Sequence, residues 1–252
     1  MSREKDFLSP DEIVATVRHS SLPTLFVEGK DDMQVFRCLE RETGCSLISC
    51  GGRTALFDVY AQREFIADKP CVFLADRDMY VFDGIPQQYD EIIFTTGYSI
   101  ENDILYDSKV EDAFSDRDLV KFDHMKKELS KWWAIELCIY TRQPELANID
   151  QKICTIFQNI DDSAPNIDMK NYTDKVLSSL KDIGPLCKTI YNDFELKMRG
   201  HNLHQLYQYF LVKGENQELK GTSRCLLHTC IHFRKPPLFQ KLIDKIQKAF
   251  LA

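Results

Sequence analysis

The chain has 252 residues, of which 44% are hydrophobic and 28% charged, and its formal net charge is −7. This length and composition predict a globular protein of one large or two modest domains and exclude a low-complexity chain. The segment MSREKDFLSPDE lacks the apolar run of a signal peptide, and no apolar run approaches the roughly 18 residues of a membrane helix. We therefore expect a cytoplasmic protein without a membrane segment.

Charge is distributed unevenly along the chain. Residues 195–252 contain ten Lys or Arg and four Asp or Glu, so this part carries +6 and the first 194 residues carry −13. Because binding depends on where charge lies, the acidic total does not exclude a polyanionic partner. The nine cysteines follow no regular spacing, and in a cytosolic chain most are expected to be reduced core residues.

The first half of the chain alternates strand-like and helix-like segments. Short apolar runs separated by helices favour a largely parallel sheet with both faces covered. We therefore expect an α/β domain over residues 1–112, with a mostly parallel four-stranded sheet flanked by helices. The expected strands are 24–29, 45–52, 69–76 and 90–96, and the expected helices between them are about 31–43 and 53–67.

The strand pattern stops after about residue 112, so residues 113–252 are expected to form a helical domain with a basic C-terminal segment. One long helix covers 121–142, where Trp132 and Trp133 are expected to pack in the core rather than form a partner-binding surface. Residues 159–168 are expected to be a loop. Further helices are expected at about 169–182, 186–198, 202–213, 219–233 and 237–250.

Carboxylates follow several of the expected strands at their C-terminal ends. Glu28 follows the first strand, Asp76 and Asp78 end the third, and Glu101 follows the fourth in GYSIEN. These ends share one edge of a parallel sheet, which is where such folds bind ligands. An isolated acid there is more often a helix cap or a solvated turn group, but a group of acids is costly unless a cation compensates it. The sequence therefore predicts a Mg²⁺ or Mn²⁺ site.

The motifs FVEGKDD, ADRD and GYSIEN, in this order, resemble the Toprim family. The first two match its Glu after strand one and its D-x-D after strand three. The third resembles the YSIEN signature of a branch of OLD-like Toprim proteins with a helical C-terminal half. That branch includes AriB-like effectors of the two-component PARIS anti-phage systems, whose partner is an ABC-type (AriA-like) ATPase. The resemblance covers residues 22–106 well and the helical half weakly.

The resemblance implies divalent-metal-dependent cleavage of nucleic acid. It assigns Glu28, Asp76 and Asp78 to the metal and the chemistry, with Glu28 serving in metal binding or in general acid/base catalysis. Glu101 is implied as a further metal ligand, and Asn102 either positions substrate or closes the start of a helix. Neither GKDD nor SCGGRT completes a phosphate-binding loop of the G-x-x-x-x-G-K-[ST] type, so any ATP dependence has to come from a partner.

Several basic residues are candidates for contacts to a substrate phosphate. Lys30 and Arg77 flank the acids and either neutralise a phosphate or pair with neighbouring aspartates. Gly51, Gly52 and Arg53 are read as a strand-to-helix turn in preference to a phosphate-binding loop. In the basic segment MRGHNLH, Arg199, His201 and His204 either reach the substrate or form a solvated helix junction.

The sequence thus favours a Mg²⁺- or Mn²⁺-dependent Toprim nuclease. Its substrate is DNA or RNA, including structured RNA such as tRNA, because the motifs act on the phosphodiester rather than on the bases. The resemblance implies a toxic anti-phage effector that a partner ABC-type ATPase regulates, and a homodimer would suit a nuclease that cuts two strands. The alternative is a catalytically silent Toprim-like scaffold that docks on the ATPase. A primase- or topoisomerase-like enzyme is a weaker reading.

Overall fold

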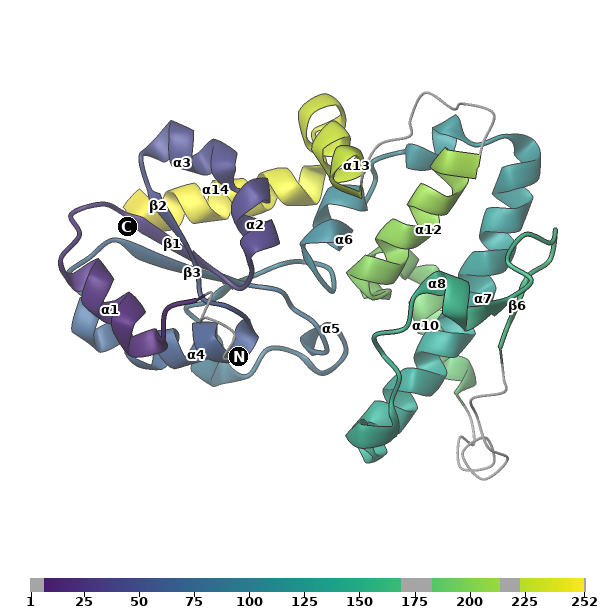
Figure 1. The fold of residues 1–252 in the computed structure, drawn as a ribbon, viewed down its shortest axis with the longest axis horizontal. Helices are drawn as coiled ribbons and strands as arrows, with labels where there is room; N and C mark the ends of the chain where they lie inside the picture. The colour runs from purple at the N-terminus through teal and green to yellow at the C-terminus, as the bar shows by residue number, and fades with distance from the viewer. Residues whose placement is uncertain (1–6, 169–182, 214–222, 252) are drawn as a thin grey trace, which may run out of the picture. The chain divides into compact units, whose positions relative to one another are not determined.

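The computed structural model describes residues 7–168, 183–213 and 223–251, and the chain forms two compact units (Figure 1). The first unit consists of Met1–Asp103 together with Lys235–Ala252, and the second consists of Ile104–Arg234. The expected domain boundary at residue 112 does not anticipate this grouping, because the last helix returns to the α/β unit. The contacts responsible are apolar ones that join segments far apart in the sequence.

The first unit is built on a four-stranded, all-parallel sheet, which confirms the predicted fold class. Its strands are β1 (Thr24–Val27), β2 (Ser46–Ser49), β3 (Cys71–Ala75) and β4 (Ile93–Phe94), in the order β2-β1-β3-β4. Val27 pairs in register with Ser49, and Ala75 pairs with Phe94. The four strands therefore end at a common edge, which is where the predicted carboxylates follow.

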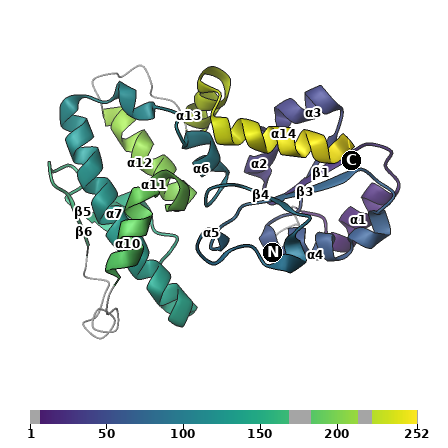
Figure 2. The same ribbon diagram turned by 180° about the vertical axis from the view of Figure 1, so that it is seen from behind.

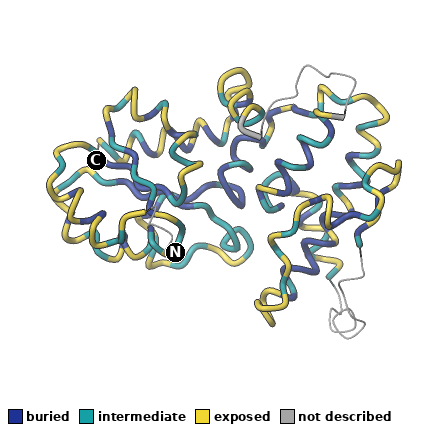
Figure 3. The backbone as a smooth tube through the Cα atoms, in the orientation of Figure 1, coloured by how far each residue is buried: buried dark blue, intermediate teal, exposed yellow. Residues whose placement is uncertain are grey.

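Helices cover both faces of this sheet (Figures 1 and 2). One face carries α1 (Pro10–Arg18) and α4 (Arg53–Ala61), and the other carries α14 (Pro237–Leu251) with α2 (Lys30–Val35) and α3 (Arg37–Thr43). Two short helices, α5 (Tyr80–Asp83) and α6 (Ile100–Leu105), follow β3 and β4. Figure 3 shows the strands buried between exposed outer helix surfaces, as expected for a parallel sheet covered on both faces.

Aromatic stacking forms the centre of the core between the sheet and α1 and α4. The rings of Phe26 and Phe73, on the paired strands β1 and β3, stack with their centroids 4.6 Å apart. Tyr60 of α4 meets Phe73 edge-on at 5.2 Å. This packing ties α4, whose first residue is Arg53, to the strand that precedes Asp76.

Two helical features differ from the expectation. The helix expected over 31–43 is interrupted at Phe36 and forms the two helices α2 and α3. Phe36 is 1% exposed, and its ring centroid lies 5.9 Å from that of Phe239 of α14. Helix α1 was not expected, although SPDE carries its start signal: Ser9 and Glu12 form a reciprocal capping box, with Pro10 in the first turn.

The second unit is mostly helical and is organised around the 27-residue helix α7 (Asp116–Arg142). Trp132 and Trp133 are at most 1% exposed, which confirms the core assignment. The expected loop 159–168 is only partly a loop: residues 159–165 connect the two short antiparallel strands β5 (Phe157–Gln158) and β6 (Asn166–Ile167), and β6 falls within the expected range. The other helices are α8 (Ile153–Ile156), α10 (Gly184–Asn192), α11 (Phe194–Lys197), α12 (Gly200–Lys213) and α13 (Ser223–Thr229), followed by a π-helical turn at Cys230–Arg234.

The helix expected over 169–182 lies outside the described residues. Gly184 and Pro185, which were expected to separate two helices, form the first turn of α10, a position that suits proline. None of the described helices combines the length and apolar character needed to cross a membrane.

Candidate functional site

Five carboxylates gather at the common C-terminal edge of the sheet in the first unit. They include the four predicted acids, and the fifth is one that the sequence analysis did not select as a site residue. Burial raises the pKa of Asp76, and the charges of the other four acids add to the shift, so all four lie within electrostatic reach of Asp76. We call this group the carboxylate cluster: Glu28, Asp32, Asp76, Asp78 and Glu101.

Glu28 and Asp76 are joined directly across neighbouring strands. Oε1 of Glu28 accepts a hydrogen bond of 3.0 Å from the backbone N–H of Asp76. Oδ1 of Asp76 in turn accepts one of 2.9 Å from the backbone N–H of Ile100, the first residue of α6. The remaining oxygen of each carboxylate, Oε2 of Glu28 and Oδ2 of Asp76, makes no hydrogen bond to the described residues.

The DRD segment is held by the segment that follows β4. The backbone N–H of Asp78 donates to the carbonyl of Tyr98 at 2.7 Å, and that of Arg77 donates to Oγ1 of Thr95 at 2.9 Å. Asp78 has a positive φ of 47°, a conformation that aspartate tolerates better than most residues and that often marks functional sites. The motifs ADRD and GYSIEN are therefore one hydrogen-bonded structure, although they are separate in the sequence.

Asn102 closes the start of α6, one of the two roles considered for it. Its Oδ1 accepts a hydrogen bond of 2.9 Å from the backbone N–H of Ser99. The Ser99 hydroxyl lies 2.5 Å from Oε2 of Glu101 and 2.9 Å from Oδ1 of Asn102, and it donates to one of them at a time. Ser99 and Asn102 therefore fix the turn that presents Glu101 to the carboxylate cluster.

Asp103 holds the turn between β4 and α6. Its two oxygens accept hydrogen bonds from the backbone N–H groups of Thr96 and Gly97, at distances of 2.7 to 3.1 Å. Its side chain is buried, and this burial raises its pKa. Asp103 thus acts as a structural acid next to the carboxylate cluster.

Burial and repulsion between carboxylates both disfavour charge on three members of the cluster, Glu28, Asp32 and Asp76. Burial, with nearby Asp78 and Asp32, raises the pKa of Glu28 to about 7 although Arg53 opposes the shift. Burial raises the pKa of Asp32 to about 6, with Glu101 and Asp31 adding to the shift. The pKa of Asp76 lies well above its usual value because of burial and the four other acids. A bound cation would relieve this repulsion.

The donor chemistry of the cluster fits a hard divalent cation. Glu28, Asp32 and Asp76 line a cavity of about 10 Å³, which is close to the space that one water molecule requires. Carboxylate oxygens are the ligands that Mg²⁺ and Mn²⁺ prefer. Within the described residues, however, no three His, Cys, Asp or Glu side chains are arranged as a ready-made metal-binding group. The acids of the cluster lie near one another, but their oxygens are not arranged as the coordination sphere of a metal ion.

No protein-family model matches the chain, and no curated protein matches it either. The Toprim resemblance therefore rests on the residues of the three motifs alone. Those residues follow the strands at one edge of the parallel sheet.

Among the described residues Lys30 and Arg77 form no ion pair with a carboxylate, which was one of the two alternatives considered for them. Nζ of the exposed Lys30 lies 4.4 Å from the ring centroid of Phe7. The guanidinium of Arg77 donates to the carbonyl of Thr96 at 3.2 Å. Arg53, which was read as part of a turn, instead forms the ion pairs: its Nη1 lies 2.6 Å from Oδ2 of Asp78 and 3.7 Å from Oε1 of Glu28.

Arg199, His201 and His204 belong to the second unit. Arg199 forms an ion pair with Asp150, and Nε2 of His201 lies 2.7 Å from Nε2 of Gln205. His204 is 4% exposed, so it is not the solvated group that one reading expected. The structure brings Glu28, Lys30, Asp76, Arg77, Asp78 and Glu101 together in the first unit.

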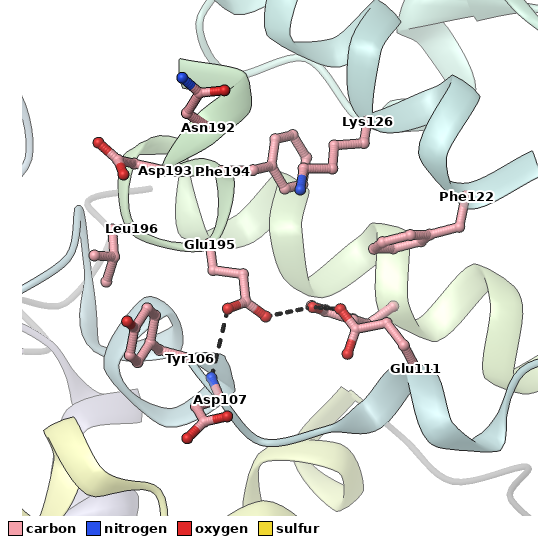
Figure 4. A pocket seen from close by; sticks show the side chains of 11 residues that line it. Tyr106, Asp107, Glu111, Phe122, Lys126, Asn192, Asp193, Phe194, Glu195 and Leu196 are labelled. Atoms are coloured by element: carbon pink, nitrogen blue, oxygen red, sulfur yellow. Dashed lines mark hydrogen bonds between the residues drawn. The ribbon is translucent and has the colours of Figure 1, made fainter. Parts of the chain in front are cut away.

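The second unit contains a larger cavity of about 360 Å³ with aromatic and acidic walls (Figure 4). Tyr207 is one of the residues that line it, and the Tyr207 hydroxyl lies 2.5 Å from Oε1 of Glu111 and 2.7 Å from Oε1 of Glu195. A phenol has one proton, so it donates to only one of these carboxylates at a time. Burial and the two acids raise the pKa of Tyr207 well above its usual value. None of the predicted site residues lines this cavity.

Proposed function

We propose that this chain is a divalent-metal-dependent nuclease that cleaves phosphodiester bonds in nucleic acid. The observation that supports the proposal best is the meeting of Glu28, Asp76, Asp78 and Glu101 at one sheet edge, where burial and repulsion disfavour charge on Glu28 and Asp76. Carboxylates in this state favour a Mg²⁺ or Mn²⁺ ion. The order of the three motifs, which resembles that of Toprim nucleases, supports the reaction class.

Under this proposal the carboxylate cluster holds the metal, with Asp32 added to the four acids predicted from the sequence. When bound, such an ion orients a phosphodiester and stabilises the charge that develops during cleavage. Glu28 holds or accepts a proton at Oε2, while its Oε1 remains on the backbone N–H of Asp76. The linked ADRD and GYSIEN segments keep Asp76, Asp78 and Glu101 in place for this work.

The substrate class and the regulation belong to the same proposal. The chain acts on DNA or RNA, with tRNA among the candidates, as the toxic effector of a bacterial anti-phage system. A partner ABC-type ATPase controls it, and homodimerisation would supply a second site for a second strand. The anti-phage role and the partner ATPase rest on the resemblance of YSIEN to the AriB-like branch, whereas the homodimer rests on analogy with nucleases that cut two strands.

A test of the proposal compares the wild type with Glu28→Gln, which retains an oxygen for the Asp76 N–H. Both proteins are incubated with plasmid DNA, single-stranded DNA and total tRNA in Mg²⁺, Mn²⁺ or EDTA, with and without the partner ATPase and its trigger. We expect metal-dependent cleavage that Glu28→Gln reduces by about 100-fold or more. Glu64→Gln, at an exposed position of the same unit, is the matched control and should cleave like the wild type.

One observation favours a second function. Within the described residues the acids are not arranged as a ready-made metal-binding group, and Arg53 already pairs with two of them. A catalytically silent scaffold that docks on the ATPase would show the same features. Failure to bind Mg²⁺ or Mn²⁺ in calorimetry, with no cleavage in the presence of the activated partner, would favour the scaffold over the nuclease.

A further inference from the structure

Arg53 lies against the three acids that were predicted to be catalytic. Its Nη1 donates to Oδ2 of Asp78 at 2.6 Å and to the backbone carbonyl of Asp76 at 2.8 Å, and it lies 3.7 Å from Oε1 of Glu28. Within the part of the chain that the structure describes, no other Lys or Arg is within ion-pair distance of these carboxylates. Among the described residues, Arg53 therefore supplies positive charge to Asp78 and Glu28 of the cluster.

The backbone before Arg53 fixes this position. The N–H groups of Gly51 and Gly52 both donate to the carbonyl of Glu28, at 3.1 and 2.8 Å. The two glycines have φ values of 88° and 129°, which other residues rarely adopt. The turn SCGGR is thus hydrogen-bonded to the residue that follows β1, and α4 begins after this turn with Arg53 beside Glu28.

Two aromatic rings support the side chain of Arg53. The guanidinium carbon lies 5.0 Å from the ring centroid of Phe57 and 4.8 Å from that of Tyr80. The side chain is 24% exposed, so its charged end is partly accessible to a ligand in solvent. A guanidinium stacked between rings loses little further freedom when it changes hydrogen-bond partner.

We propose that Arg53 is a positioning residue that alternates between two partners, the carboxylate cluster and a substrate phosphate. Without a divalent cation it neutralises Asp78 and Glu28, and it thereby competes with the cation for the same oxygens. With the cation bound, the guanidinium transfers to a phosphate oxygen of the nucleic acid, because its planar fork of donors matches phosphate as well as carboxylate. This inference rests on the nuclease function proposed above.

The first arm of the test measures metal binding alone. Isothermal titration with Mn²⁺ compares the wild-type full chain with Arg53→Met, which keeps the length of the side chain but removes its charge. We expect Arg53→Met to bind Mn²⁺ about two- to fivefold more tightly, the range that loss of one partly exposed ion pair allows. Equal or weaker binding by Arg53→Met would overturn the competition, and circular dichroism verifies that the variant is folded.

Arg63 offers a matched control within the same unit. Its Nε lies 2.7 Å from Oε2 of Glu91, and its guanidinium carbon lies 4.2 Å from the ring centroid of Tyr60. Arg63 therefore has the same two kinds of contact as Arg53, but it lies outside the carboxylate cluster. Arg63→Met should leave Mn²⁺ affinity unchanged. If neither the wild type nor Arg53→Met binds Mn²⁺, the metal site and the proposed function fail together. If both bind equally, only the role of Arg53 fails.

The second arm measures binding of a fluorescent, nuclease-resistant phosphorothioate oligonucleotide by anisotropy. In Mn²⁺, Arg53→Met should weaken binding by about tenfold, the loss expected for a charge-assisted hydrogen bond to phosphate. In EDTA the substitution should have no such effect, because Arg53 is then engaged by the acids. Arg53→Lys, which keeps the charge but loses the fork, should bind Mn²⁺ like the wild type and the oligonucleotide more weakly. An equal loss in Mn²⁺ and in EDTA would overturn the alternation between partners.

Discussion

The carboxylate of Glu28 accepts a hydrogen bond from the backbone N–H of Asp76, so the first and third strands of the sheet share one contact at their ends. The bond fixes Oε1 of Glu28 and leaves Oε2 without a hydrogen bond to the described residues. It also explains why glutamine is the informative substitution at this position, since alanine would leave the Asp76 N–H without its acceptor. Loss of function in Glu28→Gln can then be attributed to chemistry rather than to structure.

Asp103, which is not among the predicted site residues, should contribute to the stability of the fold. Replacing it with alanine removes the acceptor for the backbone N–H groups of Thr96 and Gly97. Leaving these groups unpaired should lower the free energy of unfolding by about 2 to 4 kcal/mol, measured by urea denaturation. Asp58→Ala, at an exposed position of α4, should change it by less than about 0.5 kcal/mol. Similar effects of the two substitutions would show that Asp103 does not hold the turn.

The metal-free protein should become less stable as the pH rises from about 4.5 to 7. The pKa of Glu28 is about 7 against an ordinary value of 4.5, so folding favours its protonated form. The resulting stability is present below pH 4.5 and is lost as the pH rises through 7. Glu28→Gln cannot lose this proton, so in EDTA at pH 7.5 it should be more stable than the wild type by on the order of 2 kcal/mol.

Urea denaturation at pH 4.5 and pH 7.5 measures this effect. At the lower pH, the free energies of unfolding of Glu28→Gln and wild type should differ much less, because Glu28 is then protonated in the folded state and about half protonated in the unfolded state. Asp32, with a pKa of about 6, and Asp76, whose pKa is also raised, add losses of the same sign in both proteins, and the difference between the proteins reports the charge of Glu28 together with its repulsion of the other acids. A wild type that is as stable as the variant at pH 7.5 would contradict the repulsion in the cluster.

Tyr207 should stabilise the second unit through its hydroxyl. In Tyr207→Phe, the buried oxygens of Glu111 and Glu195 lose their shared donor, which should cost about 1 to 3 kcal/mol in thermal or urea unfolding. Tyr191 donates to the more exposed Asp123 at 2.6 Å and is the matched control. Tyr191→Phe should cost clearly less, and the reverse order would show that the contacts of Tyr207 are not stabilising.

The first helix should depend on its capping box. Ser9→Ala removes the acceptor for the backbone N–H of Glu12 and the donor to its side chain. We expect a loss of about 1 kcal/mol in the free energy of unfolding. Ser9→Asp, which can still cap the helix, should restore most of that loss. An unchanged stability in Ser9→Ala would indicate that α1 is held by burial of Ile13, Val14 and Val17 alone.

Much of the first unit could be predicted from the sequence because its signals are local. The apolar runs ended by Glu28 and by Asp76 gave the strands and the edge at which the acids meet, and periodicity gave α7, α12 and α14. Asp32 was missed as a site residue because its position in FVEGKDD also suits an ordinary helix start, and it does form the hydrogen bond to the Gly29 N–H expected there. The start signal for α1 in SPDE is also local, because the capping box and the proline are both present in the sequence.

Other features depend on contacts between segments far apart in the sequence. Nothing local in SCGGR shows that Arg53 reaches Asp78, because that ion pair requires β1 and β3 to be neighbours. The return of α14 to the first unit depends on buried contacts such as that between Phe36 and Phe239. A single sequence contains no direct signal for either pairing.

The position of α14 has a consequence for the order in which the protein matures. Residues 235–252 are translated after the whole of the second unit, yet they complete the first. Until they emerge from the ribosome, the face of the sheet that α14 shares with α2 and α3 lacks α14 and the buried side chains of Phe239, Leu242 and Ile246. Domains usually fold in the order of their synthesis. Here the unit with the acidic edge begins translation first and is completed last, so a nascent chain carries the motifs well before it carries a finished site.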